Sequence, residues 1–587
     1  MALTHEVGQK SRVALADRLR SFMPAESILG WSVVLALLIL IGLPLGSVII
    51  QAFVPGLFYG DRTFSGVGTL LQVFERPLWR VSLLNSLQLA FGTAAIGTVL
   101  GAGLAFMRSQ YRFFGAGMLD AAAWALLILP SFVIAQGWVL FAARGGLAEQ
   151  LLGSTIARDV IFSPAGLILV MSLKNYPFAY LAVRAALKWN VESYAHAARL
   201  SGAGPHRVFW TIRMPLLLPA IVAGAVLVFV DTVGDFGLPA ALATTYRYPT
   251  LTYSIFTAIN QAPIRFDLAG VLSFYLVCIL MVAVALHFWV VRRSFFDFLT
   301  AAAQERAASR PTFHWLLSGI AGLFMALAFV LPLGTSLLVS LSTSLSAGFS
   351  WENLTLGHYA ETLASGSRMR ESLGNSLMIA ALAGLGSITL GLAAAYLLTF
   401  SKFALARLID VTCTTTLAVP GVILGVGFIF TWNQRWLDDL GLSLYGHPAI
   451  LVLAAIAGSV PIAVRLVLGA IAQVPASFLG AAALQGASLP RRIRTILMPL
   501  LMTGIVSAAL AAFGSSVFDL AVTSILRPPG FEVIPVTINR QFQQGDYGLS
   551  TAGTMIAGGI TVAMIVTIQA LAARFARAGV QQSAAPR

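Results

Sequence analysis

The chain has 587 residues, of which 58% are hydrophobic and only 10% are charged, and its mean hydropathy is +0.85. These values exclude an ordinary soluble domain, in which about half of the residues are apolar and about a quarter are charged. The net charge is +14, but no basic soluble segment is long enough to form a nucleic-acid-binding domain, so we expect no nucleic-acid partner.

Apolar runs of about 20 residues, the length that crosses a bilayer core of about 30 Å, recur along the whole chain. They lie at residues 29–52, 82–106, 118–142, 161–183, 216–236, 267–291, 314–340, 373–399, 409–431, 448–470, 500–522 and 550–572. The first run is too long for the core of a signal peptide and has no obvious cleavage site, so we expect a retained helix. The pattern predicts an all-α membrane protein with about twelve transmembrane helices.

Basic side chains gather in alternate connections between these runs. The connections between runs four and five and between runs ten and eleven are the clearest cases. Their basic residues are Arg184, Lys188, Arg199, Arg207 and Arg213 in the first and Arg491, Arg492 and Arg494 in the second. By the positive-inside rule these two connections, and both termini, face the cytoplasm. We therefore interpret the basic excess as a feature of topology and of contact with lipid headgroups.

Short features recur in the two halves of the chain in the same order. Asn85-Ser86-Leu87 recurs as Asn375-Ser376-Leu377, and Pro130 recurs as Pro420. Equivalent helices therefore run in the same direction, which indicates a parallel rather than an inverted repeat. A polar linker around residues 295–312 separates the halves. We expect two halves of six helices each, residues 1–298 and 299–587, related by a pseudo-twofold axis normal to the membrane.

The most specific repeat is a stretch of about 20 residues that precedes the fifth and the eleventh run. In the first copy, His196-Ala197-Ala198-Arg199-Leu200-Ser201-Gly202 is followed by Ile212-Arg213-Met214-Pro215. In the second copy, Gly480-Ala481-Ala482-Ala483-Leu484-Gln485-Gly486 is followed by Ile496-Leu497-Met498-Pro499. The offset between the copies is 284 residues at both the last glycine and the proline, so the register is kept.

The residue types in this stretch predict a helix–turn–helix elbow that leads into the next span. The small alanines suit a short helix that nests in a groove of another protein. Gly202 and Gly486 can take a positive φ and end that helix. Pro205 and Pro490 lie where a second short helix can begin.

The two copies resemble the EAA loop of ABC-importer permeases, Glu-Ala-Ala-x3-Gly-x9-Ile-x-Leu-Pro. The resemblance implies a permease of the type I ABC-importer kind, in which each elbow docks into a cytoplasmic ATPase and transmits its closure to the pore. The chain departs from the pattern where the leading Glu is His196 or Gly480, and where Pro219 is Thr503 in its repeat. The elbows cover about residues 191–215 and 475–499. The implied coupling residues are His196, Ala197, Ala198, Gly202, Arg207 and Pro215 in the first and Gly480, Ala481, Ala482, Gly486, Arg491 and Pro499 in the second.

The same resemblance implies the partners and the location. The partners are a cytoplasmic ABC ATPase in two copies, a periplasmic solute-binding protein and membrane lipid, and the location is the bacterial inner membrane with both termini in the cytoplasm. The sequence itself has no Gly-x4-Gly-Lys-[Ser/Thr] phosphate loop and no His-Glu-x2-His, Cys-x2-Cys or Gly-x-Ser-x-Gly motif. We expect a transport subunit rather than an enzyme, with no cofactor or metal of its own and with ATP and Mg²⁺ on the partner ATPase.

Charged side chains inside the predicted spans are candidates for the substrate pathway, because charge is costly in lipid and tends to face a pore or a partner. Asp231 and Asp235 lie four residues apart, on one face of the predicted fifth span, and Asp519 is the counterpart of Asp235 in the repeat. These carboxylates indicate either an acidic mouth for a cationic or metal cargo or helix ends that meet interfacial water. Lys174 and Arg465 could contact an anion or pair with the carboxylates.

Among fused double permeases, the arrangement is most similar to the ferric-iron type, with the thiamine and aminoethylphosphonate types close to it. The segment from Gly234 to Pro239 resembles the acidic, glycine- and proline-containing segment of the iron type. A secondary transporter of the major-facilitator class also has twelve spans in two parallel halves. That class is expected to carry a Gly-x3-Asp-Arg-type loop where this chain has Arg108-Ser109-Gln110-Tyr111-Arg112. A structural or receptor membrane protein needs neither the duplication nor the elbows, so the leading hypothesis is a permease for ferric iron.

Overall fold

The computed structural model describes residues 23–57, 63–64, 66–187, 191–293, 311–348, 350–472 and 474–583, and every named element in these residues is a helix. The predicted all-α membrane fold is confirmed. The predicted linker around residues 295–312 lies outside the described residues except for its last two positions. Lys188 also lies outside them. We call α2 to α16 the first half and α17 to α30 the second half.

The first half consists of α2 (Met23–Leu37), η1 (Leu38–Gly42), α3 (Leu43–Phe53), α4 (Gly68–Glu75), α5 (Pro77–Gln110), α6 (Ala116–Ile128), α7 (Ser131–Ala142), α8 (Leu147–Leu152), α9 (Ile156–Ile161), α10 (Pro164–Leu187), α11 (Val191–Leu200), α12 (Pro205–Val208), η3 (Phe209–Arg213), α13 (Met214–Gly234), α14 (Gly237–Leu242), η4 (Ala243–Tyr246), α15 (Leu251–Asn260) and α16 (Phe266–Arg293).

The second half consists of α17 (His314–Met325), η6 (Ala326–Val330), α18 (Leu331–Ser340), η7 (Leu345–Ala347), η8 (Trp351–Asn353), α19 (Gly357–Leu363), α20 (Arg368–Phe400), α21 (Ala406–Thr416), α22 (Gly421–Trp432), α23 (Arg435–Asp439), α24 (Ala449–Ile471), α25 (Ala476–Leu484), α26 (Leu489–Arg492), η9 (Ile493–Leu497), α27 (Met498–Val517), α28 (Leu520–Leu526), α29 (Ile534–Gln543) and α30 (Tyr547–Ser583).

Ten of the helices in the described residues are long and apolar enough to cross a membrane, and two bent helix pairs raise the number to twelve when each pair is taken as one span. The prediction of about twelve spans holds in this sense, but straight helices over residues 118–142 and 409–431 are wrong. The pair α6 and α7 bends by 104° and the pair α21 and α22 by 118°. Pro130 and Pro420 lie at the bends with extended backbone, where a proline, which lacks the N–H donor, weakens the helix.

Ion pairs fix which helix ends lie at the same level. Asp120 near the start of α6 bonds to Arg108 near the end of α5 (Nε–Oδ2 3.1 Å) and to Arg184 near the end of α10 (Nε–Oδ1 2.7 Å). The bent pair α6–α7 therefore begins at the level of these ion pairs, and the chain reaches the start of α10 at the opposite level. We call the level of these ion pairs, from which α11 continues, the elbow side, and the opposite level the far side.

The first span of each half packs against the opposite half. Helix α3 lies against α22 as well as α16, and α18 lies against α7 as well as α30. The crossings are tight: a Cβ atom on Gly427 would lie 2.4 Å from the Pro44 carbonyl oxygen, and one on Gly137 would lie 2.0 Å from that of Pro332. Only glycine permits these approaches. The exchange of first spans thus ties the two halves together.

Four short π-helical turns recur at equivalent places in the halves. Each ends two residues before a proline that the helix then absorbs, and the prolines are Pro44, Pro215, Pro332 and Pro499. A wider turn relieves the clash of a proline ring with the preceding turn and accommodates its missing N–H donor. The spans therefore continue through these prolines.

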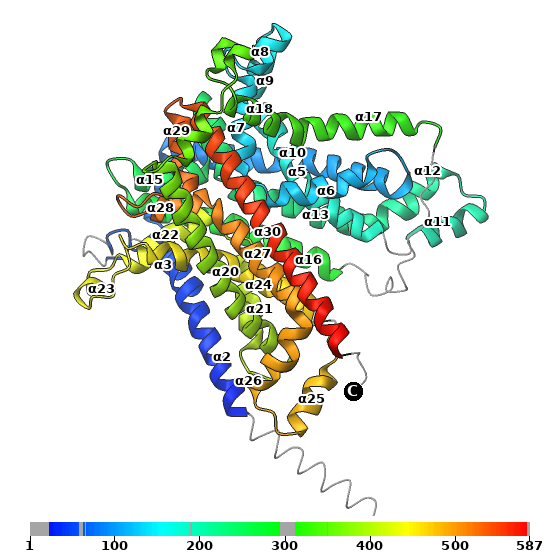
Figure 1. Ribbon diagram of the computed structural model, residues 1–587, viewed down its shortest axis with the longest axis vertical. Helices are drawn as coiled ribbons and strands as arrows, with labels where there is room; N and C mark the ends of the chain where they lie inside the picture. Colours follow the sequence, from blue (N-terminus) through cyan, green and yellow to red (C-terminus); the bar gives the residue numbers. More distant parts are fainter. Residues whose placement is uncertain are drawn as a thin grey trace, which may run out of the picture.

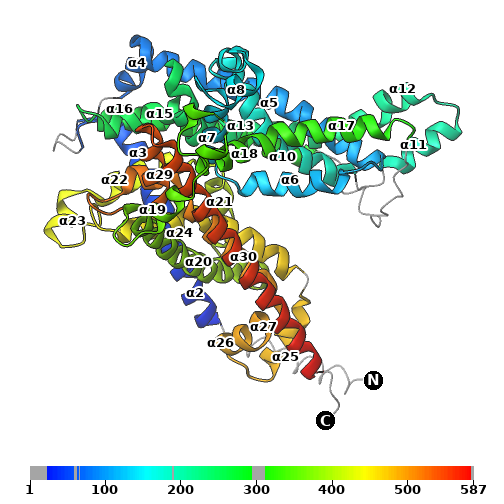
Figure 2. The same ribbon diagram turned by 45° about the horizontal axis from the view of Figure 1, so that its top comes forward.

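Two arms diverge toward the elbow side, each made mostly of one half, with α17 of the second half along the first arm and α2 of the first half along the second (Figure 1). Helices α11 and α12 lie at the tip of one arm, and α25 and α26 lie at the tip of the other. A second view shows the same separation of the tips, with the halves joined around α3, α7, α18 and α22 (Figure 2). The repeated elbows are thus placed alike on two separate arms.

Candidate functional site

Each elbow begins with a short helix that ends at its predicted glycine. In the first elbow, Gly202 has φ +86°, and the N–H of Ala203 donates to the carbonyl of Ala198 at 2.9 Å. This six-to-one bond is the Schellman arrangement, which satisfies carbonyls at a helix C-terminus. The second elbow repeats it at Gly486, with φ +81° and a 3.0 Å bond between the residues equivalent to Ala203 and Ala198. The positive φ predicted for both glycines is confirmed.

A second short helix then turns the chain into the next span. Pro205 is the first residue of α12, and Pro490 is the second residue of α26. The π turns η3 and η9 follow, and Pro215 and Pro499 are each the second residue of a long helix, α13 or α27. The predicted helix–turn–helix elbow that leads directly into a span is therefore present in both halves.

The elbows present small and apolar side chains at their surface. Leu200 is 90% exposed and Leu484 is 53% exposed, next to exposed Ala197 and Ala481. The remaining predicted coupling residues are placed on the same elements: His196 and Ala198 in α11, Arg207 in α12, Gly480 and Ala482 in α25, and Arg491 in α26. Exposed apolar side chains rimmed by polar groups are typical of protein contact sites.

The two halves also meet at a central seam, where α13 and α27 end. Gly234 ends α13 against the opposite half, and a Cβ atom there would lie 2.8 Å from Cγ of Pro420 at the bend of α21–α22. At the equivalent position in the other half, Phe518 follows α27 and its ring lies 6.2 Å from that of Phe132 near the bend of α6–α7. Each half therefore places the end of its fifth span against the broken span of the other.

Asp235 and Asp519 turn the chain at this seam. Because α13 ends at Gly234, Asp235 lies one residue beyond the helix, but it remains near Asp231, since the two carboxylates interact electrostatically with each other and with Lys174. Asp235 Oδ1 accepts hydrogen bonds from the Ser131 hydroxyl at 2.7 Å and the Gly237 N–H at 2.8 Å. Asp519 is the N-cap of α28. Both carboxylates thus start a short helix.

The other charged residues predicted for the pathway lie in ion pairs. Lys174 Nζ is 3.2 Å from Asp231 Oδ2, and Arg465 Nη2 is 2.9 Å from Asp410 Oδ1. Arg465 thus pairs on the elbow side and not with Asp519. Among the described residues, no group of three or more His, Cys, Asp or Glu side chains could hold a metal ion. The structure therefore brings Lys174, Asp231 and Asp235 together as one charged cluster, whereas the interactions of Asp519 are with backbone N–H groups of α28.

The repeated Asn-Ser pair has a structural role that sequence reasoning missed. Asn85 Nδ2 donates to the Pro249 carbonyl at 2.9 Å, and the Ser86 hydroxyl accepts from the Leu251 N–H at 2.8 Å, so the pair holds the start of α15. Asn375 and Ser376 hold the start of α29 with the same two distances. The repeat itself was the available signal, since it marked these polar residues in both halves.

The comparison with known families matches residues 82–294 and 387–580 to the family described as binding-protein-dependent transport system inner membrane component. The chain belongs to this family. Both matched segments contain one elbow and its following span. The family match excludes the major-facilitator alternative and the structural or receptor alternative. It identifies the protein as a permease subunit of an ABC transporter rather than an enzyme.

Three curated relatives illustrate the range of likeness. The ferric transport system permease protein FbpB of Actinobacillus pleuropneumoniae is 22% identical over 87% of this chain and 74% of its own length. The Fe(3+)-transport system permease protein FbpB 2 of Haemophilus influenzae is 24% identical over 88% of this chain and 93% of its own length. The molybdenum transport system permease protein ModB of Escherichia coli is 30% identical, but over only 38% of this chain.

The family membership and the ten to twelve candidate spans make this a multi-pass inner-membrane protein. The relatives are permease subunits of importers, which work with an ATPase and a solute-binding protein. The ABC permease thus has two distinct structural regions, the paired elbows and the central seam.

Proposed function

We propose that this chain is the membrane permease of an ATP-driven importer that passes ferric iron from the periplasm to the cytoplasm. The observation that carries the proposal is the pair of matching elbows at the tips of two arms. Two equivalent docking elements suit two copies of one ATPase, which binds ATP and Mg²⁺ and hydrolyses the nucleotide. The permease halves are residues 1–298 and 299–587, and the permease itself needs no cofactor.

The elbows and both termini face the cytoplasm in this proposal. The basic residues Arg199, Arg207, Arg491 and Arg494 support this orientation, because cytoplasmic connections are enriched in Lys and Arg. The far side then faces the periplasm and the solute-binding protein. A reporter fused after Arg587 should read cytoplasmic, and a periplasmic signal contradicts the orientation.

Coupling is assigned to the residues of the two elbows. The exposed face around Ala197 and Ala481 docks in the ATPase, and the glycines and prolines fix the angle at which motion of α11 or α25 reaches the next span. The leading Glu of the EAA pattern is replaced in both copies, so docking rests on the small residues and the helix geometry.

The test of coupling is capture of the ATPase by the tagged permease. The parent should retain a co-expressed ATPase from its own transport system, and Ala197→Glu/Ala481→Glu should lose it, since a bulky charge on a nesting surface is both misshapen and desolvated. Ala364→Glu is the control, because Ala364 is also exposed but lies on the far side. Retention of the ATPase by the double elbow variant contradicts the docking assignment.

Ferric iron is proposed as the cargo on the likeness to full-length ferric permeases, whereas the molybdenum relative matches only one half. Oδ1 of Asp235 and Oδ1 of Asp519 accept backbone N–H bonds at the start of short helices, so selectivity is assigned to the binding protein rather than to ligands in the pathway. Uptake of isotopic iron, thiamine and aminoethylphosphonate by cells with and without the permease distinguishes the cargoes. Permease-dependent uptake of thiamine or aminoethylphosphonate, without iron, contradicts iron and selects the alternative.

A further inference from the structure

A cavity of about 800 Å³ opens on the far side between the two halves. Its walls come from the end of α7, from α9, from α14 with η4, and from α29 with the start of α30. The first half contributes Arg144, Arg158 and Phe162, and the second half contributes Phe542 and Tyr547. A volume of several hundred cubic ångströms is the usual size of a small-molecule site.

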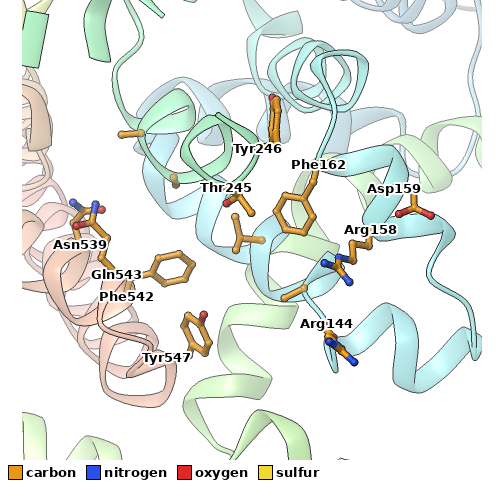
Figure 3. A pocket seen from close by; sticks show the side chains of 14 residues that line it. Arg144, Arg158, Asp159, Phe162, Thr245, Tyr246, Asn539, Phe542, Gln543 and Tyr547 are labelled. Atoms are coloured by element: carbon orange, nitrogen blue, oxygen red, sulfur yellow. The ribbon is translucent and has the colours of Figure 1, made fainter. Parts of the chain in front are cut away.

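The side chains around this cavity are basic or neutral, apart from one carboxylate that turns away. Figure 3 shows the Arg158 guanidinium directed toward the space between the two halves, whereas the Asp159 carboxylate projects from the opposite side of the helix. Arg144 lies at the rim, and the Tyr547 hydroxyl points into the space from the second half (Figure 3). Within the described residues, neither arginine forms an ion pair.

The arginines lie in a part of the fold where the two halves differ. The segment from Pro130 to Pro164 advances 34 positions, and its counterpart from Pro420 to Pro448 advances 28. After α7 the longer segment holds α8 and α9, whereas after α22 the shorter one holds α23. Arg144 is Gln434 at the equivalent position. The common fold therefore does not require these two positive charges.

We propose that this cavity is an external binding site for a small, multiply charged oxyanion, of the carboxylate or phosphate class. Guanidinium groups bind such oxygens through charge-assisted hydrogen bonds, and neutral donors from Asn539, Gln543 and Tyr547 complete a polar wall. A bare ferric cation is repelled by the same charges. The inference rests on the proposed function for the assignment of the far side to the periplasm and for iron as the cargo. With that cargo, it implies that iron reaches the permease as an anionic chelate or together with an anion.

The test measures binding to the purified full chain in nanodiscs of zwitterionic phosphatidylcholine, without ATPase, by calorimetry with citrate and with inorganic phosphate. The parent should bind at least one of these probes, and Arg144→Gln/Arg158→Gln should weaken that binding by roughly tenfold or more, because each lost bond is to a charged group. Arg370→Gln, an exposed arginine near the far side outside the cavity, is the control and should bind as the parent does.

Binding of neither probe by the parent, or unchanged binding in the double variant, overturns the proposal. Loss of uptake with unchanged anion binding also overturns it and assigns the arginines to contact with the binding protein. Because the binding measurement involves neither ATP nor transport, its outcome is separate from those of the coupling and cargo tests.

Discussion

Substitution of the two elbow glycines, Gly202 and Gly486, is the most direct test of the coupling between the ATPase and transport. A residue with a Cβ atom resists the positive φ of Gly202 and Gly486, at a cost of about 1–2 kcal/mol, and a β-branched residue resists it most. We expect Gly202→Val/Gly486→Val to insert normally but to lose most of its transport, since the short helix no longer meets the ATPase at the native angle. Solute uptake and permease-stimulated ATPase activity measure this loss.

Gly204 supplies a matched control within the same elbow. It has φ −67° and extended backbone, and no atom lies within 4 Å of a Cβ built on it. Gly204→Val should therefore transport at close to the parent rate. If the double glycine variant also transports at the parent rate, the elbows do not carry the coupling.

The ion pair of Lys174 and Asp231 predicts a second effect, in which Asp235 takes part because it also interacts with Lys174. The two side chains are 11% and 32% exposed and lie in neighbouring spans. Lys174→Met leaves a carboxylate without its partner in the membrane, and we expect a loss of about 1–3 kcal/mol, below the value for a fully buried pair because Asp231 keeps some access. Thermal unfolding in detergent measures it.

The double variant Lys174→Met/Asp231→Asn removes both charges of the ion pair and should recover part of the lost stability, since Asp235 still lacks its interaction with Lys174. A double-mutant cycle isolates the pair from other effects of each change. Equal stability of Lys174→Met and the parent means that the ion pair contributes nothing to the fold.

At the scale of helices, the crossings of the exchanged spans depend on two glycines. Gly137→Ala or Gly427→Ala places a methyl group within 2.0 Å or 2.4 Å of a backbone carbonyl oxygen, which cannot move without displacing a helix. We expect each to cost about 1–3 kcal/mol or more, as overpacking does. The midpoint of thermal unfolding should fall in both variants.

Gly103→Ala in α5 is the control for this experiment, because no atom lies within 4 Å of its Cβ position. Alanine is favoured over glycine in a helix by up to about 1 kcal/mol, so this variant should be as stable as the parent or more so. A Gly137→Ala protein as stable as Gly103→Ala would mean that the crossing of α7 and α18 has room for a methyl group.

Helix α29 should respond to pH through Glu532. Burial alone raises the pKa of this carboxyl. However, Arg540, whose Nη1 lies 3.0 Å from Glu532 Oε1, and nearby Arg527 hold the pKa below its ordinary value. A lowered folded pKa stabilises α29 above the ordinary pKa, and that contribution is lost as pH falls through the folded value. Amide protection factors in α29 should therefore hold from neutral pH to about pH 5 and decline below about pH 4.

Glu532→Gln removes the charge at every pH. Its α29 should already be less protected at neutral pH, and its protection should not change further across the acid range. Identical acid loss in the variant and the parent assigns the pH response to another group.

The sequence predicts helices better than it predicts where they bend. Pro130 and Pro177 are both repeated in the second half, yet Pro130 lies at a bend of 104° and Pro177 lies inside α10. The difference comes from tertiary contacts: the residue after Pro130 bonds to Asp235, and the equivalent proline packs on Gly234. No local pattern distinguishes the two prolines. The end of α13 and the position of Asp235 depend on the same contacts.

At the scale of the whole molecule, the separated arms predict a motion. If the ATPase subunits approach each other when they bind ATP, the elbows docked in them must approach as well. Spin labels at exposed Ser201 and Gln485, in a background with Cys278 and Cys413 replaced by Ala, report this distance by pulsed electron resonance. We expect a shorter distance with the ATPase and a non-hydrolysable nucleotide than with the permease alone.

The same labels in Gly202→Val/Gly486→Val give the control. There the ATPase can close without drawing the arms together, so the distance should change less than in the parent background. An unchanged distance in the parent background contradicts a coupling motion of the arms.

The parallel repeat and the elbows could be predicted from the sequence because they depend on local residue types and their spacing. The exchange of first spans could not, since an apolar helix suits either half equally well in composition. What selects the opposite half is the fit of the Pro44 and Pro332 carbonyls on Gly427 and Gly137. The far-side cavity was missed for a related reason, because its walls come from segments distant in sequence.

The packing of the first span on the opposite half also determines the order of events during membrane insertion. Ser47 in α3 bonds to the Gly427 carbonyl, which lies 380 residues later in the chain. At a synthesis rate of about 5–20 residues per second, α3 is in the bilayer for roughly 20–80 s before its partner α22 is synthesised. During that interval its interface is covered by lipid or by the insertion machinery. Fusing both halves in one polypeptide guarantees that the awaited partner arrives in the same place and in equal number.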